Sequence, residues 1–176
     1  MVDLATLQAV SYIMGSLGVF VAAVYYVMNI QNNRRSQQQQ LETRQAQLFM
    51  QIYSRFDDPD WMRNWAEVVR QWKWTDYDDW HSKYSPEENI EASVMYGSIA
   101  AYFEGIGVLV YRKLIDVEHV ADLMARNIII FWEKMGPIIK ERRVRYSNEY
   151  VWEWNEWLYK EIKKYQVNRK PAYLLN

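Results

Sequence analysis

A long uncharged stretch near the amino end constrains this chain more than any other feature. No side chain from Leu4 to Ile30 is charged, and at about 1.5 Å per residue such a helix can cross a hydrocarbon layer of roughly 30 Å. A secretory signal begins with basic residues, whereas here Asp3 precedes the stretch and Arg34 and Arg35 follow it. The positive-inside rule therefore predicts a retained single-pass anchor in the cytoplasmic (inner) membrane, with the N-terminus outside and the remainder in the cytoplasm.

Small residues recur at steps of three or four along this predicted span, at Ser11, Gly15, Gly18 and Ala22. A face of small side chains lets membrane helices approach closely. Such residues are also simply common in spans. With the lipid bilayer as the first partner, the pattern favours a homo-oligomer or a subunit that docks on a membrane complex.

Composition excludes several classes of protein. Half of the 176 residues are apolar and 16% are aromatic, so the chain as a whole is not disordered. It has no cysteine, which excludes disulfides, thiol nucleophiles and cysteine-ligated metals. A net charge of −1 gives no reason to expect a nucleic-acid partner. No phosphate-binding loop, dinucleotide motif or Glu-x-x-His pair occurs, so no cofactor or metal is expected.

Apolar periodicity predicts an all-α chain. We expect an N-terminal segment with the transmembrane helix at 1–33, a stalk with the first bundle helix at 34–56, a cytoplasmic helical bundle at 57–170 and a tail at 171–176. The run from Gln31 to Gln40 is polar on every side. It is either a continuous solvated helix or a flexible linker.

Local signals predict the helices of the bundle. Asp57-Asp58-Pro59 ends the first helix, and a short helix follows. The segment Thr75 to Tyr84 reads as an irregular acidic loop, and Ser85-Pro86-Glu87-Glu88 as the start of the next helix. That helix, Ala92 to Tyr111, is apolar nearly all round, so it is either the buried centre of the bundle or a second span. Further along the chain, Asp116 caps a helix, Gly136-Pro137 breaks it, and the last helix follows Ser147-Asn148.

Charged side chains supply several candidate sites. Glu104 and Glu161 fall on apolar faces, and a buried carboxylate needs a partner, so we expect ion pairs with arginines such as Arg126, Arg142 or Arg143. The acidic residues Asp76, Asp78 and Asp79 lie beside His81; they either hold a hard cation or form a solvated loop. Four basic residues form a cluster near the end of a predicted helix: Lys140, Arg142, Arg143 and Arg145. They either contact an anion or stabilise the negative end of the helix dipole.

Two aromatic residues of the last helix, Trp152 and Tyr159, lie off its main apolar face. Large rings outside a core face usually meet another surface, so these two define a candidate partner surface. They could also be exposed singly, or meet the first helix.

The segment from Arg112 to His119 offers one reading as a catalytic site. An arginine followed by a histidine after a few residues resembles the metal-independent ribonucleases of the HEPN type, which are also all-helical. That resemblance implies that Arg112 stabilises phosphate charge and that His119 handles a proton. His119 also has a structural explanation, because it lies in the first turn after Asp116.

A wider resemblance rests on YFEGIGVLVYRKLID (Tyr102 to Asp116) and FWEKMGPIIKERR (Phe131 to Arg143). These motifs resemble a widespread prokaryotic family of small membrane-anchored helical proteins of unknown function, over about Gln47 to Trp157. The family implies an N-terminal span and a cytoplasmic helical domain, and it supplies no catalytic residues. In layout alone the chain also resembles the membrane accessory proteins of RNA-targeting CRISPR systems.

Taken together, the sequence favours a non-enzymatic, membrane-tethered scaffold or subunit that oligomerises or docks on a membrane complex. The alternative is a membrane-anchored defence effector that cleaves RNA or forms a pore.

Overall fold

The computed structural model describes residues 3–169 and residue 174. Every regular element within these residues is a helix, which confirms the all-α prediction. Apart from Leu174, the predicted tail at 171–176 lies outside the described residues. The chain divides into two compact units, residues 1–44 and residues 45–176, and each is described by itself.

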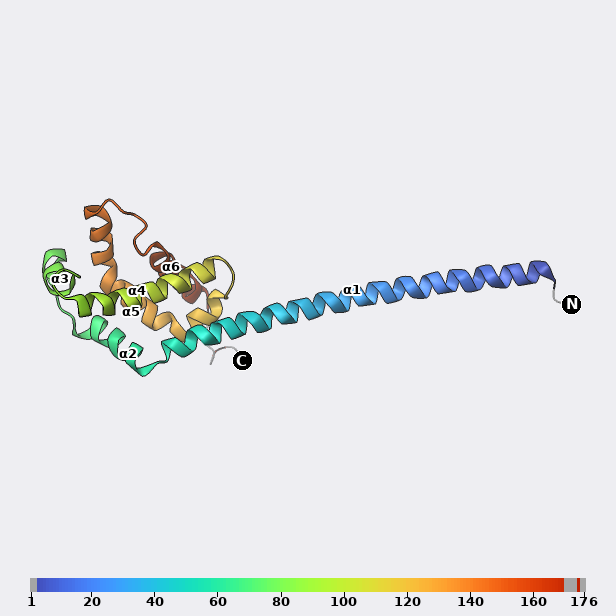
Figure 1. The fold of residues 1–176 in the computed structure, drawn as a ribbon, viewed down its shortest axis with the longest axis horizontal. Helices are drawn as coiled ribbons and strands as arrows, with labels where there is room; N and C mark the ends of the chain where they lie inside the picture. The colour runs from blue at the N-terminus through green and yellow to red at the C-terminus, as the bar shows by residue number, and fades with distance from the viewer. Residues whose placement is uncertain (1–2, 170–173, 175–176) are drawn as a thin grey trace. The chain divides into compact units, whose positions relative to one another are not determined.

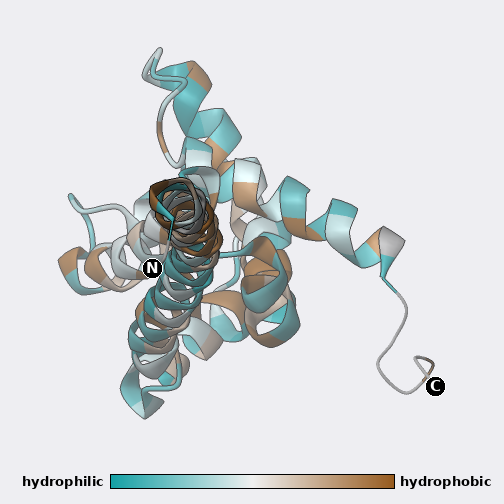
Figure 2. Cartoon of the chain, turned by 90° about the vertical axis from the view of Figure 1, so that its right-hand side faces the viewer, coloured by the Kyte–Doolittle hydropathy of each residue, from teal (hydrophilic) through white to brown (hydrophobic). Residues whose placement is uncertain are grey.

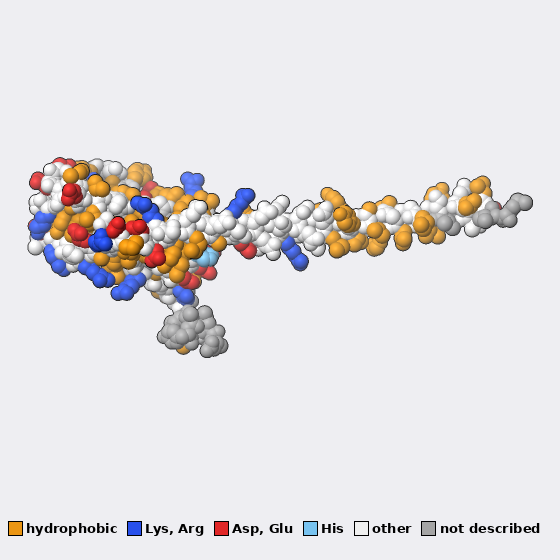
Figure 3. Space-filling model, turned by 60° about the horizontal axis from the view of Figure 1, so that its bottom comes forward, with side chains coloured by type: hydrophobic (Ala, Val, Ile, Leu, Met, Phe, Trp, Pro, Cys, Tyr) orange, Lys and Arg blue, Asp and Glu red, His pale blue; other side chains and the backbone are white. Residues whose placement is uncertain are grey.

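The first unit is the larger part of helix α1 (Leu4–Phe56), which runs through the glutamine-rich segment without a break. Every side chain described between Asp3 and Arg44 is exposed. Figure 3 shows apolar side chains gathered towards the amino end of α1 and polar ones along its middle, and the ribbon of Figure 2 is coloured as hydrophobic near that end. By length and composition, two helices of the described chain could cross a membrane. They are α1, whose best window has a mean hydropathy of 1.8 and is not buried, and α4 (Ile90–Tyr111), whose window reaches 1.4 and is 39% buried.

The second unit contains the end of α1 and all the later helices (Figure 1). Asp58 caps α2 by accepting bonds from the Asp60 and Trp61 backbone N–H groups at 3.0 and 2.9 Å. The elements are α2 (Pro59–Ala66), η1 (Glu67–Gln71), α3 (Tyr77–Tyr84), α4, α5 (Val117–Arg145) and α6 (Glu153–Asn168). After α2 the chain passes through a short π-helix and the short helix α3. Helices α4, α5 and α6 follow and build most of the core.

Helix α4 lies at the centre of this core, and the most extensive helix packing is that of α6 against α4 and α5. Residues Ile99, Ala100 and Phe103 of α4 are fully buried. Helix α1 contributes Phe49 and Phe56 to the same core. It is also fastened by the Tyr102 hydroxyl, which donates to the Ile52 carbonyl at 2.6 Å. The structure packs one face of α4 into the bundle, as the first of the two alternatives predicts. The length and composition of α4 also leave it a candidate span.

The predicted acidic loop is wrong in its conformation, because residues 77–84 form helix α3. The Asp76 side chain accepts from the Asp79 backbone N–H at 2.9 Å. Acidic residues in the first turn also suit the positive end of a helix. Tyr77 and Trp80 are buried, so packing fixes the helix that composition alone does not indicate.

Two other predicted helix boundaries differ from the structure. Helix α4 begins at Ile90 with Asn89 as its cap, whereas Ser85 is buried and its carbonyl accepts from the Glu88 and Asn89 N–H groups in a turn. Pro137 lies inside α5 and does not break it. Pro137 itself is exposed while its neighbours Ile138 and Ile139 are buried, so core packing carries the helix through the proline.

Candidate functional site

The loop that joins α4 to α5 has a specific backbone geometry. At the end of α4 the Leu114 N–H donates to the Leu109 carbonyl at 2.9 Å, and the Lys113 N–H to the Val110 carbonyl at 2.9 Å. This pattern is a Schellman cap, whose C′ residue has left-handed backbone angles and is usually glycine. Here the C′ residue is Lys113, with a φ of 57°. Its carbonyl accepts a hydrogen bond from the Gln45 side chain of α1 at 3.2 Å.

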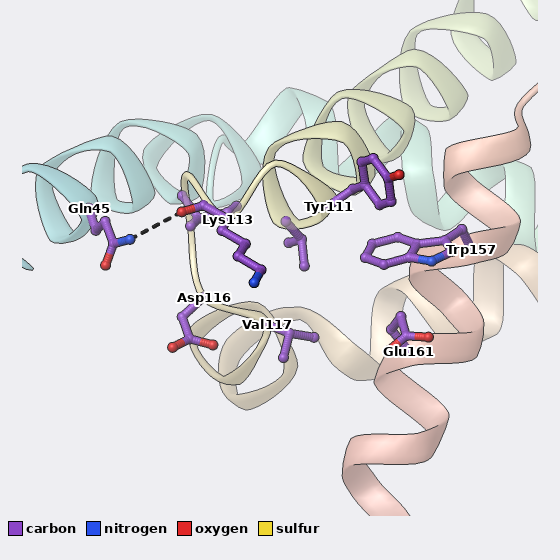
Figure 4. Close-up of a pocket in the computed structure, with 9 residues that line it drawn as sticks. Gln45, Tyr111, Lys113, Asp116, Val117, Trp157 and Glu161 are labelled. Atoms are coloured by element: carbon purple, nitrogen blue, oxygen red, sulfur yellow. Dashed lines mark hydrogen bonds between the residues drawn. The ribbon is translucent and has the colours of Figure 1, made fainter.

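Beside this loop lies a pocket of about 500 Å³, which we call the α4–α5 pocket (Figure 4). Four segments of the second unit line it: α1, the end of α4 with the loop after it, the start of α5, and the middle of α6. Its lining residues are Gln45, Val110, Tyr111, Lys113, Ile115, Asp116, Val117, Trp157 and Glu161.

One wall of the pocket is aromatic. The Tyr111 ring lies 5.5 Å from the Trp157 ring, edge to face, and 4.5 Å from the ring of Trp154 behind it. Tyr111 is 53% exposed although it is a large aromatic residue. Val110 and Ile115 add buried apolar surface at the base. Such a wall offers contact area to an apolar or flat ligand.

Two of the three charged groups that line the pocket have structural partners. The Asp116 carboxylate caps α5 by accepting from the Glu118 N–H at 3.3 Å, as the sequence predicted. Glu161 pairs with Lys164 at 2.6 Å, and its side chain is 31% exposed. The ion pair predicted for Glu161 is therefore present, with a lysine as its partner rather than an arginine. For the Lys113 ammonium, no hydrogen bond or ion pair occurs within residues 3–169.

The predicted ribonuclease pair does not line this pocket. Arg112 is the exposed C-cap residue of α4. His119 lies in the first turn of α5, and its ring lies 5.6 Å from that of Phe49 of α1. No hydrogen bond or ion pair joins these two residues in the described part of the chain.

Glu104 has a different role from the predicted ion pair. Its carboxylate accepts from the backbone N–H groups of Trp154 and Asn155 at 3.2 and 2.8 Å. Those amides open α6, whose own cap residue Trp152 provides no side-chain bond, so Glu104 of α4 caps α6 from outside. Burial raises the pKa of Glu104, and Glu153 adds to the rise. The two backbone amides and Arg143 oppose it.

The four residues of the basic cluster at the end of α5 have different surroundings in the structure. Arg143 donates to the Val151 and Trp152 carbonyls at 2.8 and 3.1 Å and pairs with Glu156 at 2.5 Å. Arg145 pairs with Glu141 and with Asp78, which lies in the predicted acidic loop. The Arg142 guanidinium lies 6.0 Å from the Tyr146 ring, and Lys140 is exposed. Anion contact therefore stays a prediction for Lys140 and Arg142, because the structure occupies the other two with internal partners.

The other acidic residues also have internal partners. Asp79 pairs with Lys83 at 2.8 Å and accepts from the Thr75 N–H at 2.9 Å. These contacts hold the pKa of Asp79 below its usual value. Within the described residues, no group of three or more histidine, aspartate or glutamate side chains is placed to hold a metal ion.

The two aromatic residues predicted as a partner surface are half-buried and pack against the core of their own domain. The Tyr159 ring lies 6.1 Å from that of Trp132 in α5, and its hydroxyl donates to Glu133 at 3.5 Å. Trp152 has left-handed backbone angles at the start of α6. Helix α5 thus covers much of the side that the helical wheel places opposite the main apolar face.

Two residues that hold α4 and α6 together were missed in the sequence. Asn155 is fully buried and donates from its side chain to the Ala100 carbonyl at 3.2 Å. At Gly107 an added Cβ would lie 2.9 Å from the Trp154 carbonyl carbon and closer still to its oxygen. Arg143 was predicted as part of the basic cluster, but its role in fastening the loop before α6 was not. The sequence did offer one signal for these contacts, because Asn155 is a polar residue at a core position of the last helix.

The fold and pocket define a class of protein. It has a long N-terminal helix with an exposed apolar segment, followed by an all-helical domain with a pocket of apolar and charged residues beside the α4–α5 loop. The chain belongs to the family described as the domain of unknown function DUF4760, whose model matches residues 13–162. That match confirms the predicted resemblance to an uncharacterised family, and it begins inside the apolar part of α1. No curated protein and no solved structure matches the chain significantly.

Proposed function

We propose that this chain is a membrane-tethered helical module that assembles with itself or docks on a membrane complex, acting by binding rather than by catalysis. One observation carries the proposal. Helix α1 has an apolar window with a mean hydropathy of 1.8 of which nothing is buried, and the same helix supplies Phe49 and Phe56 to the domain core. An exposed helix of that length and hydropathy is stable in lipid and is a liability in water.

The flanking charges support an orientation. Asp3 precedes the apolar window, while Arg34 and Arg35 follow it and are exposed. Basic residues stay on the cytoplasmic side of a span, so the N-terminus lies outside and the second unit lies in the cytoplasm.

The small residues of α1 support assembly within the bilayer. Ser11, Gly15, Gly18 and Ala22 share one face at 100° per residue, and all four are exposed. A Cβ added at Gly15 or Gly18 would meet nothing within 4 Å. A larger side chain there is therefore accommodated in a single copy and obstructs only a contact between helices.

Oxidative cross-linking in membranes tests whether the chain assembles through the small-residue face of α1. The natural chain has no cysteine, so Leu4→Cys, on the same helix face, supplies the only thiol. We expect the disulfide-linked dimer to fall about tenfold in the Gly15→Leu, Gly18→Leu double variant, which corresponds to a loss of about 1.4 kcal/mol of association energy.

Ser16→Leu is the control, because it adds a leucine side chain on another face of the same helix. Its dimer yield should equal that of the parent. Unchanged cross-linking in the double variant, or an equal fall in the Ser16 variant, would contradict assembly through the small-residue face.

A further inference from the structure

We propose that the α4–α5 pocket binds a single-chain amphiphile with an anionic head group, and that the Lys113 ammonium receives that head group. This goes beyond membrane tethering, because it assigns a ligand to the second unit, whatever surrounds α1. Four observations carry it: the unpaired Lys113 ammonium, the backbone at Lys113, the apolar wall and the volume.

The Lys113 ammonium is the charged group of the lining that has no partner among the described residues. Asp116 and Glu161 also line the pocket, but the first caps α5 and the second pairs with Lys164. Lys113 is the lining cation and has no acceptor within residues 3–169. Figure 4 shows its side chain extending from the loop into the space above Val117, with Asp116 below it and Trp157 across the pocket. A carboxylate or phosphate there would form a charge-assisted hydrogen bond with an ammonium that is otherwise unpaired.

The backbone conformation of Lys113 suggests that its side chain has a function. The residue occupies the left-handed position of a Schellman cap, where glycine avoids the steric cost that every other residue bears. Left-handed non-glycine residues cluster at functional sites. The Gln45 side chain donates to the Lys113 carbonyl and holds the loop in place. The Lys113 side chain therefore extends from a fixed backbone position.

The remaining lining suits an aliphatic chain. Val110, Ile115 and Val117 supply branched side chains, and Tyr111 and Trp157 supply ring surface. A volume of about 500 Å³ lies within the range of roughly 300–1,000 Å³ that is usual for small-molecule pockets. An inorganic anion alone would leave this apolar surface uncovered, which is why the proposal names an amphiphile.

Photo-labelling of the full chain in phosphatidylcholine nanodiscs tests the proposal. The probe is decyl phosphate with a diazirine in its chain, and the matched probe has a trimethylammonium head on the same chain. We expect the phosphate probe to label residues 110–117 and 157–161 about tenfold more than the cationic probe, the ratio that one charge-assisted bond supplies. Equal labelling by the two probes would overturn the proposal.

Variants of the loop separate binding from folding. Lys113→Gly removes the ammonium and also the left-handed strain, so its denaturation midpoint should hold or rise while labelling falls about tenfold. Lys113→Arg keeps the charge and should keep the labelling. Arg112→Ala removes a neighbouring cation that does not line the pocket, and it should label like the parent. Undiminished labelling of the stable Lys113→Gly variant would refute the assignment.

Competition distinguishes the sources of the amphiphile. Protection by single-chain lysophosphatidylglycerol added to the nanodisc supports a membrane lipid as the ligand, and protection by decanoate alone supports a soluble fatty-acid-like ligand. Protection by inorganic phosphate to the same extent as by decyl phosphate would overturn the proposal, because the chain would then contribute nothing.

Discussion

Replacing Gly107 with alanine is expected to lower the free energy of unfolding by about 3 kcal/mol. The added Cβ would lie 2.9 Å from the Trp154 carbonyl carbon and nearer to its oxygen, and both atoms belong to the backbone of α6. A backbone cannot rotate out of the way as a side chain can. The helices α4 and α6 would have to separate, with loss of contacts around Leu158 and Ile162. Urea denaturation of the full chain in detergent, followed by tryptophan fluorescence, measures the change.

Gly105→Ala is the control within the same helix. Gly105 is exposed, and a Cβ added there would meet nothing within 4 Å. Alanine favours a helix interior over glycine, so this variant should gain about 0.5–1 kcal/mol. Substitutions two residues apart are thus expected to act with opposite signs. Equal effects at the two positions would contradict the close approach of α6 to α4.

Replacing Glu104 with alanine is expected to cost about 2–4 kcal/mol, the lower part of the range for two unsatisfied donors, because both N–H groups are only part-buried. The carboxylate accepts from the Trp154 and Asn155 amides, and without it both N–H groups at the start of α6 lose their partner. Each buried donor left without a partner costs about 1–3 kcal/mol.

Glu161→Ala is the matched control in the same denaturation assay. That carboxylate pairs with the exposed Lys164, so its loss should cost less than about 1 kcal/mol. Indistinguishable costs for the two variants would show that Glu104 does not cap α6.

The pH dependence of the Glu104 variant gives an independent readout. Because burial raises the pKa of Glu104, the folded chain holds this proton more tightly than the unfolded chain. The resulting stability is present below the unfolded pKa of the carboxyl and is lost as pH rises through the folded pKa. The cost of Glu104→Ala should therefore be larger at about pH 4 than at about pH 8. A cost that grows with rising pH would contradict the raised pKa.

Helix positions could be predicted where local chemistry decides them. The cap at Asp116 and the end of α1 before Asp57-Asp58-Pro59 follow from capping and proline rules that need no partner. Helix α3 and the continuation of α5 through Pro137 could not be predicted, because buried side chains such as Trp80 and Ile139 fix them by contacts distant in sequence.

The candidate site was predicted only in part, for the same reason. Glu104 stands out as a charge in an apolar helix, which correctly marks it as needing a partner. Its partners are backbone amides, and any residue type supplies those, so no pattern reveals them. Lys113 carries no sequence signal at all. Only its left-handed backbone and its place in the pocket single it out.

Thiol labelling of intact spheroplasts with a membrane-impermeant maleimide tests the central claim most directly. Two single-cysteine variants are compared, Asp3→Cys before the apolar window and Glu149→Cys on the exposed loop before α6. A membrane-tethered chain with its N-terminus outside predicts that the first variant is labelled and that the second is labelled only after lysis. Labelling of Glu149→Cys in intact spheroplasts, or protection of both thiols until lysis, would contradict the account.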